Sequence, residues 1–162
     1  MMSHWVTLTA CRTGLMVLMM ALGACASNAP EPEEVTVRYQ PEQSREWVRQ
    51  GRQAYEAGRP EAALDAWRKA LAADPTNAIV RNNLGLVLKE LARFSEAAET
   101  FEEGLAETPE VADMHYNLAV ISELYLLDFT KALKHYRQFQ DLSGGRDAQV
   151  AGWIADLERR LQ

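Results

Sequence analysis

The stretch from Asn82 to Pro109, NNLGLVLKELARFSEAAETFEEGLAETP, matches the residues before it when the chain is shifted by 34 positions. The residues that coincide at this offset are Gly51 with Gly85, Ala63 with Ala97, Trp67 with Phe101, and Pro75 with Pro109. A period of this length is typical of a unit made of two antiparallel helices. The prolines close the second helix of each unit, because proline cannot donate to the helical hydrogen-bond ladder.

Three such units follow one another along the chain. The predicted units comprise residues 44–77, 78–111 and 112–143. In the third unit Ala119 takes the place of the glycine, Tyr136 takes that of the second-helix aromatic residue, and the turn holds one extra residue. A single pair of helices cannot bury its apolar stripe alone, whereas three stacked pairs can. The sequence therefore predicts an all-α repeat fold.

Small and large residues alternate in a way that suits this packing. Small side chains recur where two antiparallel helices must come close, and large side chains fill the gaps between them. The small residues are Gly51, Ala63, Ala70, Gly85, Ala97, Ala119 and Ala132. The large residues are Trp47, Trp67, Leu84, Phe101, Leu118 and Tyr136. This pattern predicts which positions form the core.

These residues resemble the pattern of the tetratricopeptide repeat, which has Trp, Leu-Gly and Tyr in its first helix and Ala, an aromatic residue, Ala and Pro in its second. The resemblance extends over residues 44–143. It implies a right-handed superhelix of helix–turn–helix units, with the first helix of each unit lining a concave surface. Members of this family bind segments of other proteins, so the resemblance also implies peptide or protein partners.

Residues 146–162 are predicted to form one more helix, which covers the open end of the third unit. Gly144 and Gly145 break the chain before this helix, and Asp147 suits its N-cap. The apolar residues that share one face of the helix are Val150, Trp153, Ile154, Leu157 and Leu161. The alternative interpretation is an amphipathic helix that binds a membrane or a partner.

Residues 1–24 have the features of a lipoprotein signal peptide. The stretch from Thr13 to Ala24 has no charged residue, and it is shorter than the ~20 residues that a transmembrane helix needs. It leads into Leu-Gly-Ala-Cys, ending at Cys25, which resembles the lipobox of bacterial lipoproteins. The resemblance implies that Cys25 carries diacylglycerol, becomes the first mature residue and is anchored by more than one acyl chain. An ordinary secretory signal peptide that ends near a cysteine is the alternative.

The residues after Cys25 predict where the anchor is placed. Ala26 and Ser27 follow it, without the Asp that lipoproteins of the inner membrane often carry there in Gram-negative bacteria. This resembles the outer-membrane class, so we expect the chain to face the periplasm. Residues 25–43 are predicted to comprise the lipidated cysteine and a flexible tether rich in Pro and Glu.

Composition and charge exclude some classes of function. The chain has a formal net charge of −6, with 23 acidic against 17 basic side chains. Nucleic-acid binding needs clustered Lys and Arg, so this balance argues against a nucleic-acid partner. No cysteine follows Cys25, so the folded part must be held by packing without disulfides.

No arrangement of residues in the sequence points to catalysis or to a metal. His115 and His135 lie in the two predicted helices of the third unit, with no cysteine or motif to join them. The sequence also has no Gly-rich phosphate loop. We therefore expect no enzyme activity and no cofactor, and we interpret both histidines as packing or surface residues.

The resemblance implies a binding groove along the first helices, at places two, five, six, nine and twelve of each unit. The candidate binding residues are Arg45, Arg49, Arg52, Asn82, Asn83, Leu86, Lys89, Asn117 and Val120. The other residues at these places are Val48, Tyr55, Ile79, Asp113, Tyr116 and Glu123. Asn83 and Asn117 recur at place six, where an amide can both donate to and accept from a peptide backbone. We expect these two side chains and Arg49 to face water.

These features together predict an outer-membrane-anchored periplasmic adaptor. It would hold or organise protein partners of an envelope assembly, such as pilus, cell-wall or energy-transduction machinery. Some family members hold a carboxyl-terminal tail with a set of Lys, Asn and Arg residues, but only Asn83 matches that set, so no such specificity is implied. The alternative is a structural module of the envelope that associates with copies of itself and has no peptide ligand.

Overall fold

The structure, a computed structural model, describes residues 39–162. The predicted signal peptide, Cys25 and most of the predicted tether lie outside the described residues. The described part consists of helices and turns, without a strand. Its helices are α1 (Pro41–Glu56), α2 (Pro60–Ala73), α3 (Ala78–Glu90), α4 (Phe94–Glu107), α5 (Ala112–Leu124), α6 (Phe129–Leu142) and α7 (Ala148–Arg160).

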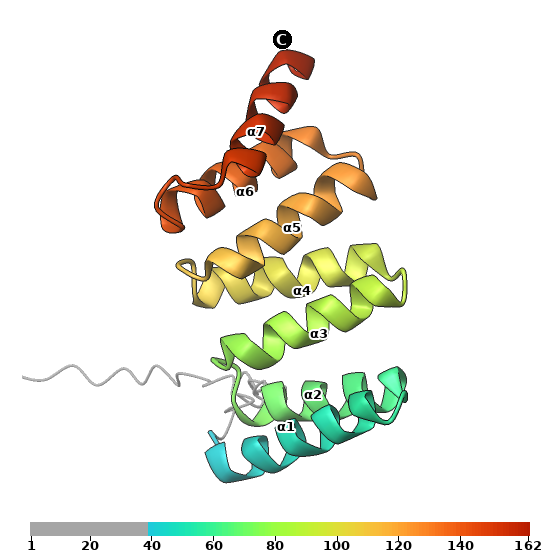
Figure 1. The fold of residues 1–162 in the computed structure, drawn as a ribbon. Helices are drawn as coiled ribbons and strands as arrows, with labels where there is room; N and C mark the ends of the chain where they lie inside the picture. The colour runs from blue at the N-terminus through green and yellow to red at the C-terminus, as the bar shows by residue number, and fades with distance from the viewer. Residues whose placement is uncertain (1–38) are drawn as a thin grey trace, which may run out of the picture. The chain divides into compact units, whose positions relative to one another are not determined.

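Figure 1 shows α1 to α7 following one another along a single stack, with consecutive helices running in nearly opposite directions. The pairs α1 and α2, α3 and α4, and α5 and α6 form the three repeats, and α7 follows them. The prediction of an all-α superhelix of helical repeats is therefore confirmed. None of the helices in residues 39–162 combines the length and the apolar character that a bilayer crossing needs.

Local sequence signals explain where the helices begin. Proline stands in the first turn of both α1 and α2, where its missing N–H would be unpaired in any case. Asp147 caps α7 as predicted, since its carboxylate accepts from the backbone N–H groups of Gln149 and Val150 at 3.0 Å. The predicted end of the tether at residue 43 is wrong, because α1 begins at Pro41 and thus includes the last three tether residues.

Close approach of helices explains the small residues of the repeat. Gly51 lies directly against the indole ring of Trp67, so a methyl group at this position would overlap the ring. A methyl group at Gly85 would lie 2.5 Å from the ring carbon Cζ of Phe101. These contacts join the two helices of the first and second repeats, so the predicted pairing of small and large residues is confirmed there.

The third repeat differs at its turn, as the sequence predicts. The turn between α5 and α6 comprises residues 125–128 and is one residue longer than the corresponding turns of the first two repeats. All three turns contain one residue with a positive φ, namely Gly58 at 69°, Ala92 at 57° and Leu127 at 56°. The side chain of Leu127 is also exposed.

Helix α7 covers the end of the third repeat, as predicted. Val150 and Leu157 are fully buried against α6, and Trp153 is partly buried. The indole of Trp153 lies 5.4 Å from the ring of Tyr136, centroid to centroid. Leu161 does not share this face, because it follows the last helical residue and is exposed. The predicted apolar face therefore ends one turn earlier, at Leu157.

Candidate functional site

A groove of about 340 Å³ lies between α1 and α3, with Trp67 of α2 contributing to its lining. We call it the α1–α3 groove. Its lining residues are Val48, Arg52, Tyr55, Trp67, Ile79, Asn83, Leu86, Val87 and Glu90. The structure thus brings together six residues that the sequence placed on the concave side, namely Val48, Arg52, Tyr55, Ile79, Asn83 and Leu86. Three of them lie on α1 and three on α3, and on each helix they recur about one turn apart.

The α1–α3 groove exposes apolar side chains to solvent. The side chain of Ile79 is 75% exposed and that of Tyr55 is 40% exposed. Beneath them Trp67 is buried, and its ring centroid lies 6.1 Å from that of Tyr55. Among the described residues, the indole Nε1 of Trp67 has no hydrogen-bond acceptor. The groove therefore offers an apolar surface that residues 39–162 do not cover.

One hydrogen bond joins the two sides of the groove. The hydroxyl of Tyr55 donates to the carboxylate of Glu90, at 2.9 Å and 3.0 Å from its two oxygens. This hydrogen bond and the negative charge of Glu90 raise the pKa of Tyr55. Sequence reasoning did not include Glu90, because it lies one position beyond the last groove place of its repeat. The sequence feature that could have pointed to Glu90 as a groove residue is its place in the final turn of α3, next to Lys89.

The predicted arginines do not all lie at the groove. Arg52 lines it, whereas Arg45 and Arg49 do not. Each of these two pairs with an acidic residue three positions earlier in α1, Arg45 with Glu42 and Arg49 with Glu46. Both pairs are exposed to solvent, and exposed pairs of this kind contribute little to stability. Of the three candidate arginines, Arg52 is therefore the one that lines the groove.

The expectation that Asn117 faces water is wrong. Its side chain is buried, and its amide Nδ2 donates to Oδ1 of Asn82 at 3.2 Å. Because α5 packs against α3, place six of the third repeat meets the first helix of the repeat before it. Asn83 is half-buried and remains at the α1–α3 groove, and Arg49 is exposed as expected.

The remaining candidates of the third repeat lie against the core. Val120 and Tyr116 pack on the cluster formed by the third repeat and α7. The ring of Tyr116 lies 5.2 Å from that of Phe139 and 6.3 Å from the indole of Trp153. Lys89 is partly buried at the end of α3 and does not line the α1–α3 groove. The groove that the structure forms is therefore confined to the first two repeats.

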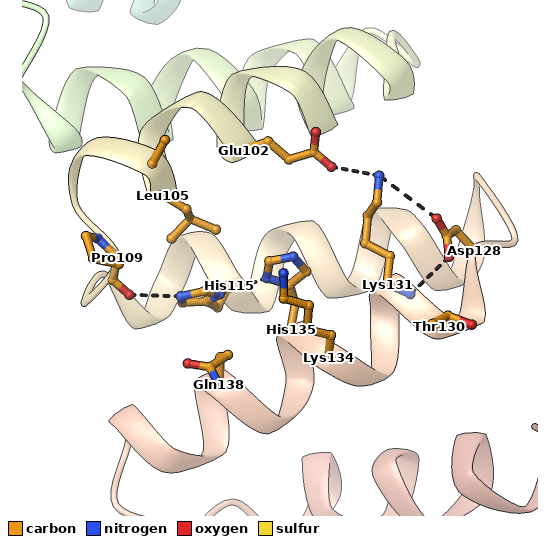
Figure 2. Close-up of a pocket in the computed structure, with 11 residues that line it drawn as sticks. Glu102, Leu105, Pro109, His115, Asp128, Thr130, Lys131, Lys134, His135 and Gln138 are labelled. Atoms are coloured by element: carbon orange, nitrogen blue, oxygen red, sulfur yellow. Dashed lines mark hydrogen bonds and ion pairs between the residues drawn. The ribbon is translucent and has the colours of Figure 1, made fainter.

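A second cavity, of about 610 Å³, lies among α4, α5 and α6 and is shown in Figure 2. We call it the histidine cavity, because His115 and His135 both line it. Their Nδ1 atoms lie 2.8 Å apart, and Nε2 of His115 lies 2.9 Å from the carbonyl oxygen of Pro109. Both rings are buried, which agrees with the first of the two predicted roles, packing or surface residues, but no motif in the sequence indicates that they contact each other.

Burial of His135 lowers its pKa to about 4, and the positive charges that His115, Lys134 and Lys131 can carry act in the same direction. The carboxylate of Glu102 opposes this change. At neutral pH His135 is therefore uncharged. In residues 39–162 no three His, Cys, Asp or Glu side chains are grouped in a way that would hold a metal ion.

Comparison with known proteins relates this fold to a family. Residues 54–121 match the model of the tetratricopeptide repeat. The N-terminal domain of stress-induced protein-1 from C. elegans is 20% identical, with a TM-score of 0.65, covering 73% of this chain and 96% of that one. The first tetratricopeptide repeat domain of Spaghetti, solved with an HSP90 peptide, is 16% identical, with a TM-score of 0.67 and coverage of 76% and 97%.

A bacterial structure has the same fold. The type III secretion chaperone SycD of Yersinia enterocolitica, solved with a peptide of the translocator YopD, is 12% identical to this chain. The TM-score is 0.66, and the match covers 76% of this chain and 98% of that one. Residues 54–121 thus match the tetratricopeptide repeat family model, and residues 39–162 have the fold of tetratricopeptide repeat domains.

Proposed function

We propose that this chain is a protein-binding adaptor whose α1–α3 groove holds an extended segment of a partner protein. The observation that carries the proposal is the exposure of Ile79 and Tyr55 beside the polar groups of Arg52 and Asn83. Uncovered apolar surface next to a few polar groups is typical of a binding site. The Spaghetti and SycD domains, both solved with peptides, support the same type of function.

The chemistry of the groove suggests how a segment would bind. An apolar side chain of the partner would pack among Val48, Ile79 and Leu86. The amide of Asn83 would pair with the partner's backbone, because it can donate and accept at once. The guanidinium of Arg52 would bind a carbonyl or carboxylate oxygen. The carboxylate of Glu90 already accepts a hydrogen bond from Tyr55, and its negative charge favours a segment without an acidic side chain at that end of the groove.

We also propose that Cys25 carries lipid and that the domain faces the periplasm from the outer membrane. The support is the lipobox-like sequence at Cys25 and the absence of Asp after it. In that location the partners would be proteins of an envelope assembly, for example in pilus, cell-wall or energy-transduction machinery. The adaptor would then keep its partner close to the membrane surface.

A photo-crosslinking residue in the groove tests the first proposal. It would replace Ile79 in the full chain, and the matched control would carry it at Ala151, which is exposed on α7. Native envelopes should give a partner crosslinked from position 79 and not from position 151. Equal crosslinking from both positions would remove the groove as the binding site. Crosslinks from position 79 to a second copy of the chain would instead support the self-associating module.

Calorimetric titration with the crosslinked partner gives the second test. The double variant Arg52→Ala and Asn83→Ala should lose affinity by on the order of a hundredfold, because it removes one charged and one neutral hydrogen-bonding group. Arg49→Ala is the control, since Arg49 is an arginine of the same helix that does not line the groove. Asn117 is not a useful position for this test, because its hydrogen bond to Asn82 is part of the folded structure.

A further inference from the structure

The histidine cavity shares no residue with the α1–α3 groove. One wall is apolar and consists of Leu105, Ala106 and Pro109. The other side carries polar and charged groups, and Figure 2 shows Gln138 and Lys134 on the same helix as His135. Lys134 is exposed and makes no ion pair with a described residue. The cavity thus combines an apolar wall with a cation that the domain leaves uncompensated.

The hydrogen bonds of the histidine pair fix which ring nitrogens carry protons. The carbonyl oxygen of Pro109 can only accept, so Nε2 of His115 must carry a hydrogen. A neutral His115 then has a lone pair at Nδ1, and Nδ1 of His135 must donate to it. It follows that Nε2 of His135 is unprotonated when both rings are neutral.

That nitrogen is left without a partner. His135 as a residue is only 7% exposed, and it lines the cavity. Its Nδ1 is bonded to His115, and no described residue forms a hydrogen bond with its Nε2. Because Nε2 of His135 is not one of the fully buried atoms that lack a partner, it is accessible from the cavity, where a ligand can form the hydrogen bond that the described residues do not.

Protonation at this atom keeps the pair intact. A proton on Nε2 of His135 leaves the Nδ1-to-Nδ1 hydrogen bond in place, whereas a second proton between the two Nδ1 atoms would break it. The resulting imidazolium would need a negative partner. Glu102 of α4 faces it but is held by Lys131 at 2.7 Å, and Asp128 lies 3.9 Å from the same ammonium group. The nearby carboxylates are therefore already paired with Lys131.

We propose that the histidine cavity is a second binding site, for a carboxylate with a short aliphatic body, which binds together with a proton on Nε2 of His135. The carboxylate lies between the imidazolium and Lys134, and the aliphatic part packs on the apolar wall. The proton comes from solvent, and no covalent bond changes. This site is independent of the α1–α3 groove, because none of the groove residues contributes to it.

Proton uptake makes binding depend on pH. Binding of one ligand molecule is accompanied by the uptake of at most one proton. The affinity should therefore rise by up to about tenfold when the pH is lowered by one unit. The useful range is pH 7.5 to 5.5, where a simple carboxylic acid is still ionised. A cation with the same aliphatic body should not bind, because Lys134 repels it and it cannot stabilise a proton on the ring.

Nitrogen NMR of the full chain with ¹⁵N-labelled histidines tests the proposal, using hexanoate as the probe and hexylammonium as the control. Hexanoate should move the Nε2 signal of His135 towards that of a protonated ring, and should bind more tightly as pH falls. An unchanged Nε2 signal, or equal binding of hexylammonium, would overturn the proposal. N-acetylleucine forms a third arm, in which tighter binding than hexanoate supports a protein carboxyl terminus as the natural source of the carboxylate. Tighter hexanoate supports a small free acid.

Two variants distinguish the loss of a ligand contact in the histidine cavity from a change in the fold. Lys134→Gln removes an exposed charge and should weaken hexanoate binding at least tenfold without altering the thermal midpoint. His135→Asn keeps a donor near His115 but has no Nε2, so any remaining binding should lose its dependence on pH. Lys69→Gln on α2 is the matched control and should bind like the unmodified chain. Binding by His135→Asn with the original pH dependence would also overturn the proposal.

Discussion

The buried state of His135 predicts that the domain loses stability between pH 7 and pH 5. In the folded chain the pKa of His135 is lowered to about 4 by burial and by the neighbouring charges. In the unfolded chain the same side chain takes a proton near its ordinary pKa of 6.5. Between these values the unfolded state binds more protons than the folded state, so the free energy of unfolding decreases as pH falls.

The size of this effect follows from the two pKa values. Each pKa unit corresponds to about 1.4 kcal/mol, so the full difference is worth about 3 kcal/mol once pH falls below both values. Between pH 7 and pH 5 the expected loss is roughly 2 kcal/mol, because only part of the titration lies in this range. That is a large fraction of the 5–15 kcal/mol that stabilises a typical domain.

Urea unfolding of the full chain at pH 7, 6 and 5 measures this loss. In His135→Asn the amide can still donate to Nδ1 of His115, but the side chain does not titrate. The variant should therefore lose about 2 kcal/mol less than the unmodified chain over this range. Thr130→Ala, an exposed change on the same helix, should keep the original dependence. The same loss in His135→Asn as in the unmodified chain would refute the reasoning.

The range from pH 7 to pH 5 separates the titration of His135 from that of the hydrogen-bonded carboxylates. The Arg49 hydrogen bond lowers the pKa of Glu46, and the Arg93 hydrogen bond lowers that of Glu96. The stability that these ionised groups contribute is present above their ordinary pKa of 4.5 and is lost only as pH falls through the lowered values. Both therefore titrate below pH 5, outside the window of the measurement.

Three further predictions concern packing and the anchor. Gly85→Ala should lower the free energy of unfolding by about 1–3 kcal/mol, because the added methyl group overlaps an aromatic ring of α4. Gly152 has open space around it, so Gly152→Ala should raise the free energy of unfolding by up to about 1 kcal/mol in the same urea experiment. Leu157→Ala should cost about 2–5 kcal/mol if α7 covers the third repeat, and an unchanged midpoint would contradict that role. Cys25→Ala should end the incorporation of labelled lipid and move the chain from the membrane fraction to the soluble periplasm; unchanged partition would contradict lipidation.

The helical repeats were predictable because their contacts are local and periodic. Gly51 meets Trp67 within one repeat, and Gly85 meets Phe101 in the same way one period later. Each repeat also contacts mainly its neighbours, so its boundaries and core positions recur in the sequence at a fixed interval. Helix starts follow from residues such as Asp147, whose capping role needs only the next few residues of the chain.

Contacts between helices that depend on their rotation were not predictable. His115 and His135 stand 20 positions apart without a motif, and only the relative rotation of α5 and α6 brings their Nδ1 atoms to 2.8 Å. The position of Asn117 in its repeat matches that of Asn83, yet the two side chains differ in exposure. The place of a residue in its repeat therefore predicts which side of the helix it lies on, but a neighbouring first helix determines whether that side is covered.

The third repeat shows why the groove is short. Its first-helix residue Tyr116 has the same place as Asn82 of the second repeat, and it packs on Trp153 of α7 much as Asn82 contacts Asn117 of α5. The hydrogen bond between Asn117 and Asn82 joins α5 to α3 on the same side of the stack. The helix at the end of the stack thus covers first-helix residues of the third repeat, including Tyr116 and Val120. In residues 39–162 the open groove lies along the first two repeats, so the proposed partner segment would lie mainly along α1 and α3, and the third repeat is available for the separate role proposed at the histidine cavity.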